Sequence, residues 1–234
     1  MPSLGFRSTV GTVPTSAMRI AIMQPYFFPY AGYFRLFAAT DLFVVLDDVQ
    51  FPRRGWVHRN RLHTASGDTA WLTLPIEKTP QSASITDQRL RPDADATIDE
   101  QRRRFPVFDD PRATGNEVVA ALRPAAGGLV DYLEPQLAAV CARLGLDTPM
   151  QRASELAIDP ELRAADRLIA IALALGADTY VNSPGGRALY DEHTFASHGL
   201  TLEFLPDHDG PFTSMLERVV LESAADLRAE IPER

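Results

Sequence analysis

Lysine, cysteine and long apolar runs are all scarce in this 234-residue chain. Lys78 is the one lysine and Cys141 the one cysteine, so the sequence excludes an internal disulfide and a cysteine-cluster metal site. No apolar run approaches the roughly 20 residues that a membrane-spanning helix needs. Residues 1–17 lack the contiguous apolar region of a secretion signal and are expected to form a flexible extension. We therefore expect a cytoplasmic protein without membrane insertion.

Basic charge is also limited. The chain carries 31 acidic against 23 basic residues, a formal net charge of −8. Nucleic acids and anionic lipids are held by basic surfaces, so neither is an expected partner. Any anion must instead bind at a local site on the protein, as part of a small-molecule substrate. Apolar residues make up 45% of the chain, which is enough for one core, and we predict a single domain over 18–234.

The order of apolar runs predicts an α/β fold with a mostly parallel sheet and flanking helices. Residues 19–23 and 42–46 read as buried strands joined through a short helix at 34–40, which is a βαβ unit. A helix is predicted over 160–175, with Asp159 as N-cap and Gly176 as its stop. Strands at 179–181 and 200–205, with a short helix before residue 198, complete a second unit.

The middle of the chain predicts an insertion in this sheet. Residues 56–64 and 70–76 are expected to form a hairpin with a turn at 65–68. Residues 80–111 are polar and contain several prolines, which indicates a connecting region with some short structure. A helix is predicted at 129–144, with Pro135 near its start or at a kink. The stretch 80–150 is therefore expected to be a partly helical insertion.

Three polar segments follow predicted strands, where open α/β sheets collect ligands. The first runs from Gln24 to Tyr33 and packs five aromatic residues and two prolines between a strand and a helix. It offers three phenol hydroxyls for a ring or sugar, those of Tyr26, Tyr30 and Tyr33. An aromatic cluster that merely covers the sheet edge fits the composition equally well. The amide of Gln24 favours a ligand site, because a polar group next to a buried strand needs partners.

The second segment begins with Asp47 and Asp48. One of them could bind a metal or act as a general base while the other orients it, or the pair could simply form a turn. His58 is a further candidate for proton transfer. The basic residues that follow are candidates for binding a carboxylate, phosphate or pyrophosphate, although they could instead be solvated charges on an edge strand. With their neighbours Trp56 and Asn60, the predicted substrate-binding residues of this segment are Arg54, Trp56, Arg59, Asn60 and Arg61.

The third segment follows the strand at 179–181. Asn182, Ser183, Gly185 and Gly186 form a loop that could turn backbone N–H groups toward an anion, with Tyr190 beyond it. A plain strand-to-helix connection is almost as good an explanation. His63, His193, His198 and His208 show no metal-ligand spacing, so we predict no metal site and treat these four as surface or capping residues.

Several of these blocks resemble one family. MRIAIMQPYFFPYAGYFRLF, FVVLDDVQF, RGWVHRNRL and WLTLPI look like the N-terminal half of WbqC-like proteins, and LGADTYVNSPGGRALYDEHTFASHGLTLEFLP looks like their C-terminal half. That family is associated with bacterial O-antigen and related polysaccharide gene clusters, and a glycine (aminoacyl) transferase role has been suggested for it. The resemblance implies a biosynthetic transferase. The site positions that it implies are Gln24, Pro25, Tyr33, Asp47, Asp48, Trp56, Arg59, Asn60, Arg61, Asn182, Gly185, Gly186 and Tyr190.

The first loop is also similar to another superfamily. Nucleotidylyltransferases of the HIGH superfamily carry Phe-x-Pro and then His-x-Gly-His between the first strand and helix. Here Phe27 to Tyr33 is one residue shorter, with Tyr30 and Tyr33 where the histidines would fall. The likeness implies a related fold, but a neutral phenol cannot supply the phosphate contact of an imidazolium.

Together these features predict an acyl or aminoacyl transferase, with glycyl as one candidate group, that acts on a sugar nucleotide, glycan precursor or related metabolite. The natural alternatives are an ATP-dependent nucleotidyl or adenylyl transferase and a noncatalytic ligand-binding module. The sequence predicts no certain cofactor. The co-substrate could be ATP with Mg²⁺ or an acyl or aminoacyl donor. A carrier protein or a partner enzyme of a polysaccharide or natural-product pathway fits the first hypothesis.

Overall fold

A computed structural model describes residues 17–124 and 126–231, and the predicted extension 1–17 falls almost wholly outside them. The strands are β1 (Arg19–Met23), β2 (Leu42–Val45), β3 (Arg59–His63), β4 (Thr69–Thr73), β5 (Met150–Arg152), β6 (Thr179–Asn182) and β7 (Thr201–Phe204). The α-helices are α1 (Ala31–Ala38), α2 (Ala94–Arg102), α3 (Glu117–Ala120), α4 (Leu129–Arg143), α5 (Ala164–Ala174), α6 (Glu192–Ala196), α7 (Met215–Leu221) and α8 (Ala224–Ala229). Short 3₁₀ helices are η1 (Pro106–Phe108), η2 (Pro111–Ala113), η3 (Ala153–Glu155) and η4 (Pro184–Ala188).

The central sheet has five parallel strands in the order β5-β2-β1-β6-β7, and β3 and β4 form a separate antiparallel hairpin. From β1 the chain moves outward to β2 and β5, then returns to place β6 on the other side of β1. The order of strands therefore reverses between β1 and β6. In open parallel sheets such a reversal leaves a crevice at the carboxyl ends of the strands. The predicted α/β class with a parallel sheet is confirmed.

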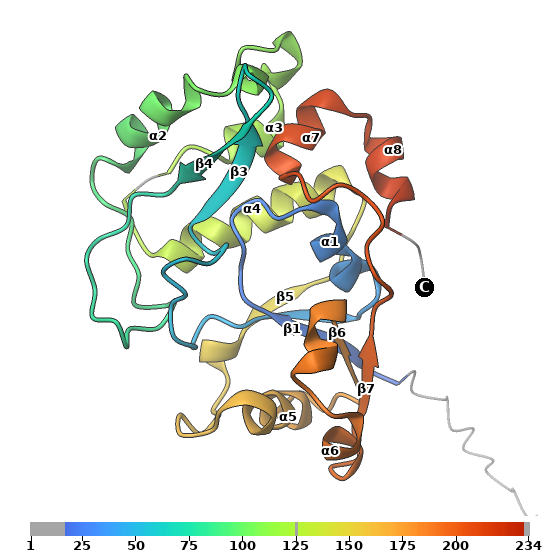
Figure 1. Cartoon of the computed structure of the whole chain (residues 1–234). Coiled ribbons are helices and arrows are strands. Elements are labelled where there is room, and N and C mark those ends of the chain that lie inside the picture. The colour runs from blue at the N-terminus through green and yellow to red at the C-terminus, as the bar shows by residue number, and fades with distance from the viewer. Residues whose placement is uncertain (1–16, 125, 232–234) are drawn as a thin grey trace, which may run out of the picture.

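The alternation of side chains along the strands builds two cores, one on each face of the sheet. Ile20 and Val44 point toward α5 and α6, whereas Ala21 and Phe43 point toward α1 and α4. Figure 1 shows these helices on opposite sides of the sheet. Because both faces are covered, the strands read as continuous apolar runs, which is why they could be found in the sequence.

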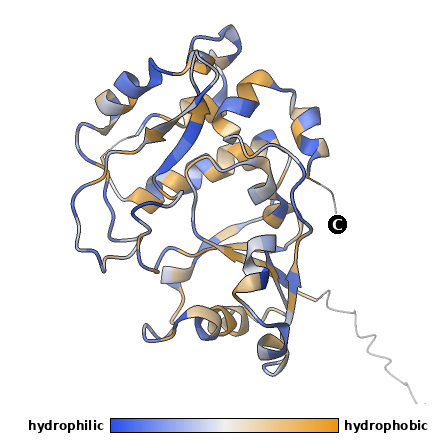
Figure 2. Cartoon of the chain, viewed as in Figure 1, coloured by the Kyte–Doolittle hydropathy of each residue, from blue (hydrophilic) through white to orange (hydrophobic). Residues whose placement is uncertain are grey.

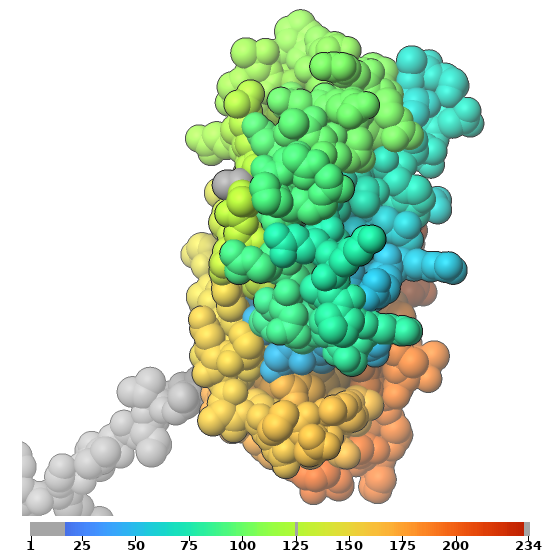
Figure 3. Space-filling model, turned by 90° about the vertical axis from the view of Figure 1, so that its left-hand side faces the viewer, coloured from blue at the N-terminus to red at the C-terminus, as the bar shows by residue number. Residues whose placement is uncertain are grey.

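The residues between β2 and β5 form a layer of their own over the α1 side of the sheet. It contains the β3–β4 hairpin, α2, α3 and α4, and α7 packs against it. In Figure 3 the part coloured from teal to yellow-green gathers at one end of the molecule, away from the orange residues that follow α5. The predicted insertion is therefore present, and it joins the larger of the two cores. Cys141 is buried in this core, and burial raises the pKa of its thiol to about 12.

Several predicted boundaries were wrong. The first helix begins at Ala31 rather than at residue 34. Helix α2 is an instance of the short structure predicted within the connecting region 80–111. The helix predicted from residue 160 begins at Ala164, whose φ of 47° interrupts the helical path. Asp159 caps a turn instead, accepting a hydrogen bond from the backbone N–H of Glu161 (2.9 Å). Pro135 lies inside α4, not near its start.

No helix in the described parts of the chain combines the length and apolar character required to cross a bilayer.

Candidate functional site

A cavity of about 570 Å³ lies at the carboxyl ends of β1 and β6, where the strand order reverses. Four parts of the chain meet there: the end of β1 with the loop and helix after it, the start of the hairpin, the turn after β6, and the segment after β7. The lining residues are Met23, Tyr26, Pro29, Tyr30, Gly32, Tyr33, Leu36, Trp56, Asn60, Ser183, Pro184, Gly185, Asp207, His208 and Phe212. The cavity is thus mainly apolar and aromatic, with a few polar groups.

The loop after β1 is clamped by hydrogen bonds from distant residues. Buried Asn60 donates its Nδ2 to the backbone carbonyls of Phe27 (3.0 Å) and Phe28 (2.6 Å). Ser214 Oγ also donates to the Phe28 carbonyl (2.7 Å). Phe28 has a φ of 43°, a conformation that costs energy in a residue with a side chain and persists because its surroundings fix it. The clamp fixes the aromatic loop in one conformation.

Asn60→Ala is expected to lower the free energy of unfolding by about 1–2 kcal/mol, because the Phe27 carbonyl loses its donor while the Phe28 carbonyl keeps Ser214. Urea unfolding at pH 7 measures the change. The loop should loosen at the same time, seen as faster amide hydrogen exchange of Phe27 and Tyr30. Unchanged exchange there would contradict the clamp.

The phenols of this loop are neutral donors near pH 7. Burial raises the pKa of Tyr26, Tyr30 and Tyr33, most strongly for Tyr33. Tyr33 donates its hydroxyl to the backbone carbonyl of Gln24 (2.8 Å). Gln24 therefore contributes a backbone oxygen to the loop, and its side chain is not among the cavity walls. Tyr26 and Tyr30 line the cavity without a hydrogen bond from either hydroxyl to another described residue.

The segment after β7 supplies a histidine that the sequence analysis placed at the surface. His208 lines the cavity, with only 6% of its side chain exposed, and its ring lies 5.2 Å from that of Tyr30 and 5.5 Å from that of Phe212. Gly32 makes this approach possible, since a Cβ there would stand 2.8 Å from the His208 Cγ. The prediction for His208 was wrong because 170 and more residues separate it from the loop that it contacts.

Two residues of the C-terminal helices lie behind His208. Its Nε2 is 3.4 Å from the Pro211 carbonyl and 4.0 Å from Glu230 Oε2. Glu230 in turn accepts hydrogen bonds from Arg218 at 2.5 and 2.8 Å, and this guanidinium lowers the pKa of the Glu230 carboxyl. Because both groups near Nε2 are acceptors, the arrangement favours the neutral tautomer with the ring proton on Nε2. Nδ1 then carries the free lone pair and contacts no partner among the described residues.

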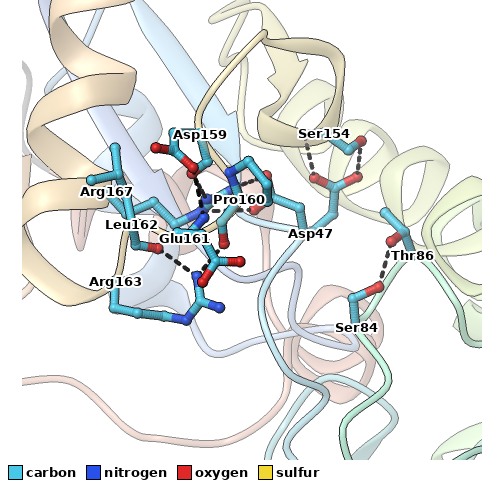
Figure 4. A network of polar contacts seen from close by, with 11 residues as sticks. Asp47, Ser84, Thr86, Ser154, Asp159, Pro160, Glu161, Leu162, Arg163 and Arg167 are labelled. Carbon is cyan, nitrogen blue, oxygen red and sulfur yellow. Dashed lines mark hydrogen bonds and ion pairs between the residues drawn. The ribbon is translucent and has the colours of Figure 1, made fainter.

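The structure places Asp47 and Asp48 away from this cavity, beside α5. Asp47 is fully buried and accepts from the Ser154 backbone N–H (2.9 Å) and hydroxyl (2.6 Å), a pairing visible in Figure 4. Burial raises the pKa of the Asp47 carboxyl, and the Ser154 bonds oppose that rise. Asp48 pairs with buried Arg167. Asp48 and Ser154 border a second hollow of about 550 Å³. Both aspartates thus have structural partners.

The predicted residues of the hairpin separate into two groups. Trp56 and Asn60 reach the cavity, whereas Arg59 and Arg61 lie on the opposite face of β3 over Trp71. Arg54 is exposed, and its backbone carbonyl accepts from Arg59. His58 is buried against Phe51, with ring centroids 5.1 Å apart, and does not line the cavity.

The predicted loop after β6 is a 3₁₀ helix, η4, rather than an open cradle. Ser183 and Gly185 line the cavity. Asn182 is buried and accepts from the Ser183 N–H (2.7 Å), and Gly186 packs so closely on the Asn182 amide that a Cβ would stand 2.2 Å from it. The Gly186 N–H is used within the turn, as a donor to the Ser183 carbonyl. Tyr190 packs on Phe195 instead of entering the cavity.

Within residues 17–124 and 126–231, no group of three or more His, Cys, Asp or Glu side chains is arranged to hold a metal ion.

Comparison with known proteins identifies the family. The model of the WbqC-like protein family matches residues 24–215. The chain belongs to the WbqC-like protein family. The match includes every cavity-lining residue except Met23, and it ends before Arg218 and Glu230. Within 206 aligned residues, this WbqC-like chain is 27% identical to the uncharacterised protein Rv1507c of Mycobacterium tuberculosis, over 82% of this chain and 83% of the relative. No solved structure matches the chain, and the HIGH-superfamily likeness is not confirmed.

Proposed function

We propose that this WbqC-like protein transfers an acyl or aminoacyl group, such as glycyl, to an amino group or hydroxyl of a ring-containing metabolite. The cavity at the β1–β6 reversal carries the proposal. Its size suits a small organic ligand, and its aromatic walls with convergent polar groups are typical of such sites. The sugar-nucleotide or glycan-precursor class and a role in polysaccharide biosynthesis are what the family resemblance implies. A cytoplasmic setting and a natural-product pathway as the alternative context are further parts of the proposal.

In this proposal His208 accepts the proton. The acceptor nitrogen or oxygen attacks the carbonyl carbon of the donor, its proton moves to His208 Nδ1, and the donor's leaving group departs with the bonding electrons. Negative Glu230 lies 4.0 Å from Nε2 and would stabilise the imidazolium that forms. We favour His208 over Asp47, Asp48 and His58 because it lines the cavity and they do not. An activated donor could come from a carrier protein or a partner enzyme.

The test combines binding with turnover. The protein is incubated with activated glycine donors and a panel of amino sugars and sugar nucleotides, and mass spectrometry follows the gain of one glycyl group. His208→Asn should bind the acceptor as the wild type does but lose turnover by about a hundredfold or more, the usual range for a removed general base. Tyr190→Phe, which lies outside the cavity, is the control. Unchanged turnover in His208→Asn would remove this histidine from the mechanism.

Trp56→Ala tests the cavity itself. Trp56 forms part of its wall and is 42% exposed, so it can stack on a bound ring. Losing one aromatic contact is expected to weaken acceptor binding about fivefold to tenfold, with little effect on unfolding. Isothermal titration calorimetry measures the affinity. Equal affinities for Trp56→Ala and the wild type would place the ligand elsewhere.

Adenylyl transfer is the second candidate, because nucleotides bind at strand-order reversals of parallel sheets. Sustained pyrophosphate release from ATP, Mg²⁺ and an amino acid would favour it over direct transfer.

A further inference from the structure

Positive charge is concentrated in one stretch of this acidic chain. From Val49 to Gly67 the sequence has no Asp or Glu, yet it contains Arg53, Arg54, Arg59 and Arg61. None of these arginines forms an ion pair with a carboxylate in the described residues. Figure 2 shows most of β3, which carries two of them, in the hydrophilic colour. In the described parts of the chain, the charges of these four arginines are therefore not neutralised by a directly paired carboxylate.

Two of these cations share one aromatic ring. The guanidinium carbon of Arg59 lies 4.2 Å from the centroid of Trp71, and that of Arg61 lies 4.5 Å from it. Arg59 is held in place by a hydrogen bond from its Nη2 to the Arg54 carbonyl (2.6 Å), and its Nε is buried without a partner. Two like charges over one ring repel each other, and a bound anion would reduce that repulsion. Guanidinium groups are well shaped to bind phosphate oxygens.

This group adjoins the cavity. Trp71 lies 5.3 Å from Trp56, centroid to centroid, and Trp56 is part of the cavity wall. Asn60, between the two arginines on β3, points to the other face of the strand and also lines the cavity. We call Trp56, Trp71, Arg59 and Arg61 the arginine–tryptophan cluster. The contact between Trp56 and Trp71 is thus the point at which the cavity meets the cluster.

We infer that the arginine–tryptophan cluster binds the diphosphate of a ligand whose ring or sugar occupies the cavity, which makes nucleoside diphosphates and their sugar esters the substrate class. Each of the two guanidiniums over Trp71 can bind one of two adjacent phosphoryl groups, whereas a single carboxylate would contact only one guanidinium. The inference rests on the proposed function, since it assigns that function's substrate, but it depends on different residues.

Intrinsic fluorescence gives a direct test, because Trp56 and Trp71 are the two tryptophans of the chain. The five common nucleoside diphosphates, the matching nucleosides and inorganic pyrophosphate are each titrated into the full chain. At least one diphosphate is expected to change the emission and to bind at least about tenfold more tightly than its nucleoside, with an affinity that falls as salt is added. If no diphosphate binds better than its nucleoside, the inference is overturned.

Charge-matched variants locate the binding. Arg59→Gln with Arg61→Gln should reduce diphosphate affinity at least about tenfold and leave nucleoside affinity unchanged. Arg103→Gln with Arg123→Gln removes the same charge at exposed positions away from the cavity and should bind as the wild type does. If the double variant on β3 unfolds, exposed Arg61→Gln alone is measured against Arg103→Gln. An equal loss of diphosphate affinity in the β3 variant and its control would indicate only a general effect of net charge. It would overturn the inference that the arginine–tryptophan cluster binds the diphosphate.

The outcomes separate this inference from the proposed function. In one outcome, sugars or nucleosides bind with an affinity that Trp56→Ala lowers, while diphosphates bind no more tightly than nucleosides. That result would support the cavity as the ligand site and contradict diphosphate binding by the arginine–tryptophan cluster. If diphosphates bind through Arg59 and Arg61 but no group transfer occurs, the cluster stands and the transferase proposal fails.

Discussion

Asp48→Ala is expected to lower the free energy of unfolding by about 3 kcal/mol, the largest effect among the substitutions considered. Arg167 is 7% exposed and bonds to Asp48 through both Nε and Nη2. Removing the carboxylate would leave a buried guanidinium with only the Asp159 carbonyl as a partner (3.2 Å), and an unpaired buried charge is costly. Urea unfolding at pH 7 measures the change.

Glu100→Ala is the matched control, because it also removes one negative charge but from an exposed position on α2 without a partner in the described residues. Its stability should lie within about 0.5 kcal/mol of the wild type. If Asp48→Ala is as stable as this control, the Asp48–Arg167 ion pair contributes nothing to the free energy of unfolding. If it is stable but has lost turnover, Asp48 has the catalytic role that the sequence suggested.

Between pH 7.5 and pH 5, the titration of His58 alone is expected to lower the free energy of unfolding by about 2 kcal/mol. Burial, helped by the positive charge of Arg59, lowers the pKa of His58 to about 4. In the unfolded chain the same group titrates near 6.5, so between these values the unfolded state binds the extra proton. The stabilisation that neutral His58 gives the folded state is complete above pH 6.5 and is lost as the pH falls toward 4.

His58→Phe should reduce this acid sensitivity, because phenylalanine keeps the contact with Phe51 and does not titrate. The quantity to compare is the change in unfolding free energy between pH 7.5 and pH 5 for variant and wild type. Asp47, whose raised pKa acts in the opposite direction, is present in both and cancels. His193→Gln, an exposed site, should retain the wild-type pH dependence. The same dependence in His58→Phe would show that His58 is not the source.

The sheet could be read from the sequence because it depends on local patterns. Apolar runs at residues 19–23 and 42–46 signalled strands covered on both faces, and the turn at 65–68 closed a hairpin whose Gly67 has a φ of 85°. The aromatic loop after β1, marked in the sequence by polar and aromatic residues at a strand's carboxyl end, lines a cavity in the structure, and its role as a ligand site stays a prediction. By itself the sequence determined the α/β class, the family and this loop.

Only the tertiary structure decided which side chains share the cavity. His208 and Phe212 join Tyr30 from the far end of the chain, and nothing in their own neighbourhood marks them. Asp48, in contrast, lies near the loop in sequence but turns to Arg167 on α5, because the buried guanidinium requires a carboxylate. Hydrophobic periodicity and turn-forming residues are local patterns that span a few residues of the sequence. Burial and charge pairing depend on contacts between residues that are far apart in the sequence and meet only in the folded protein.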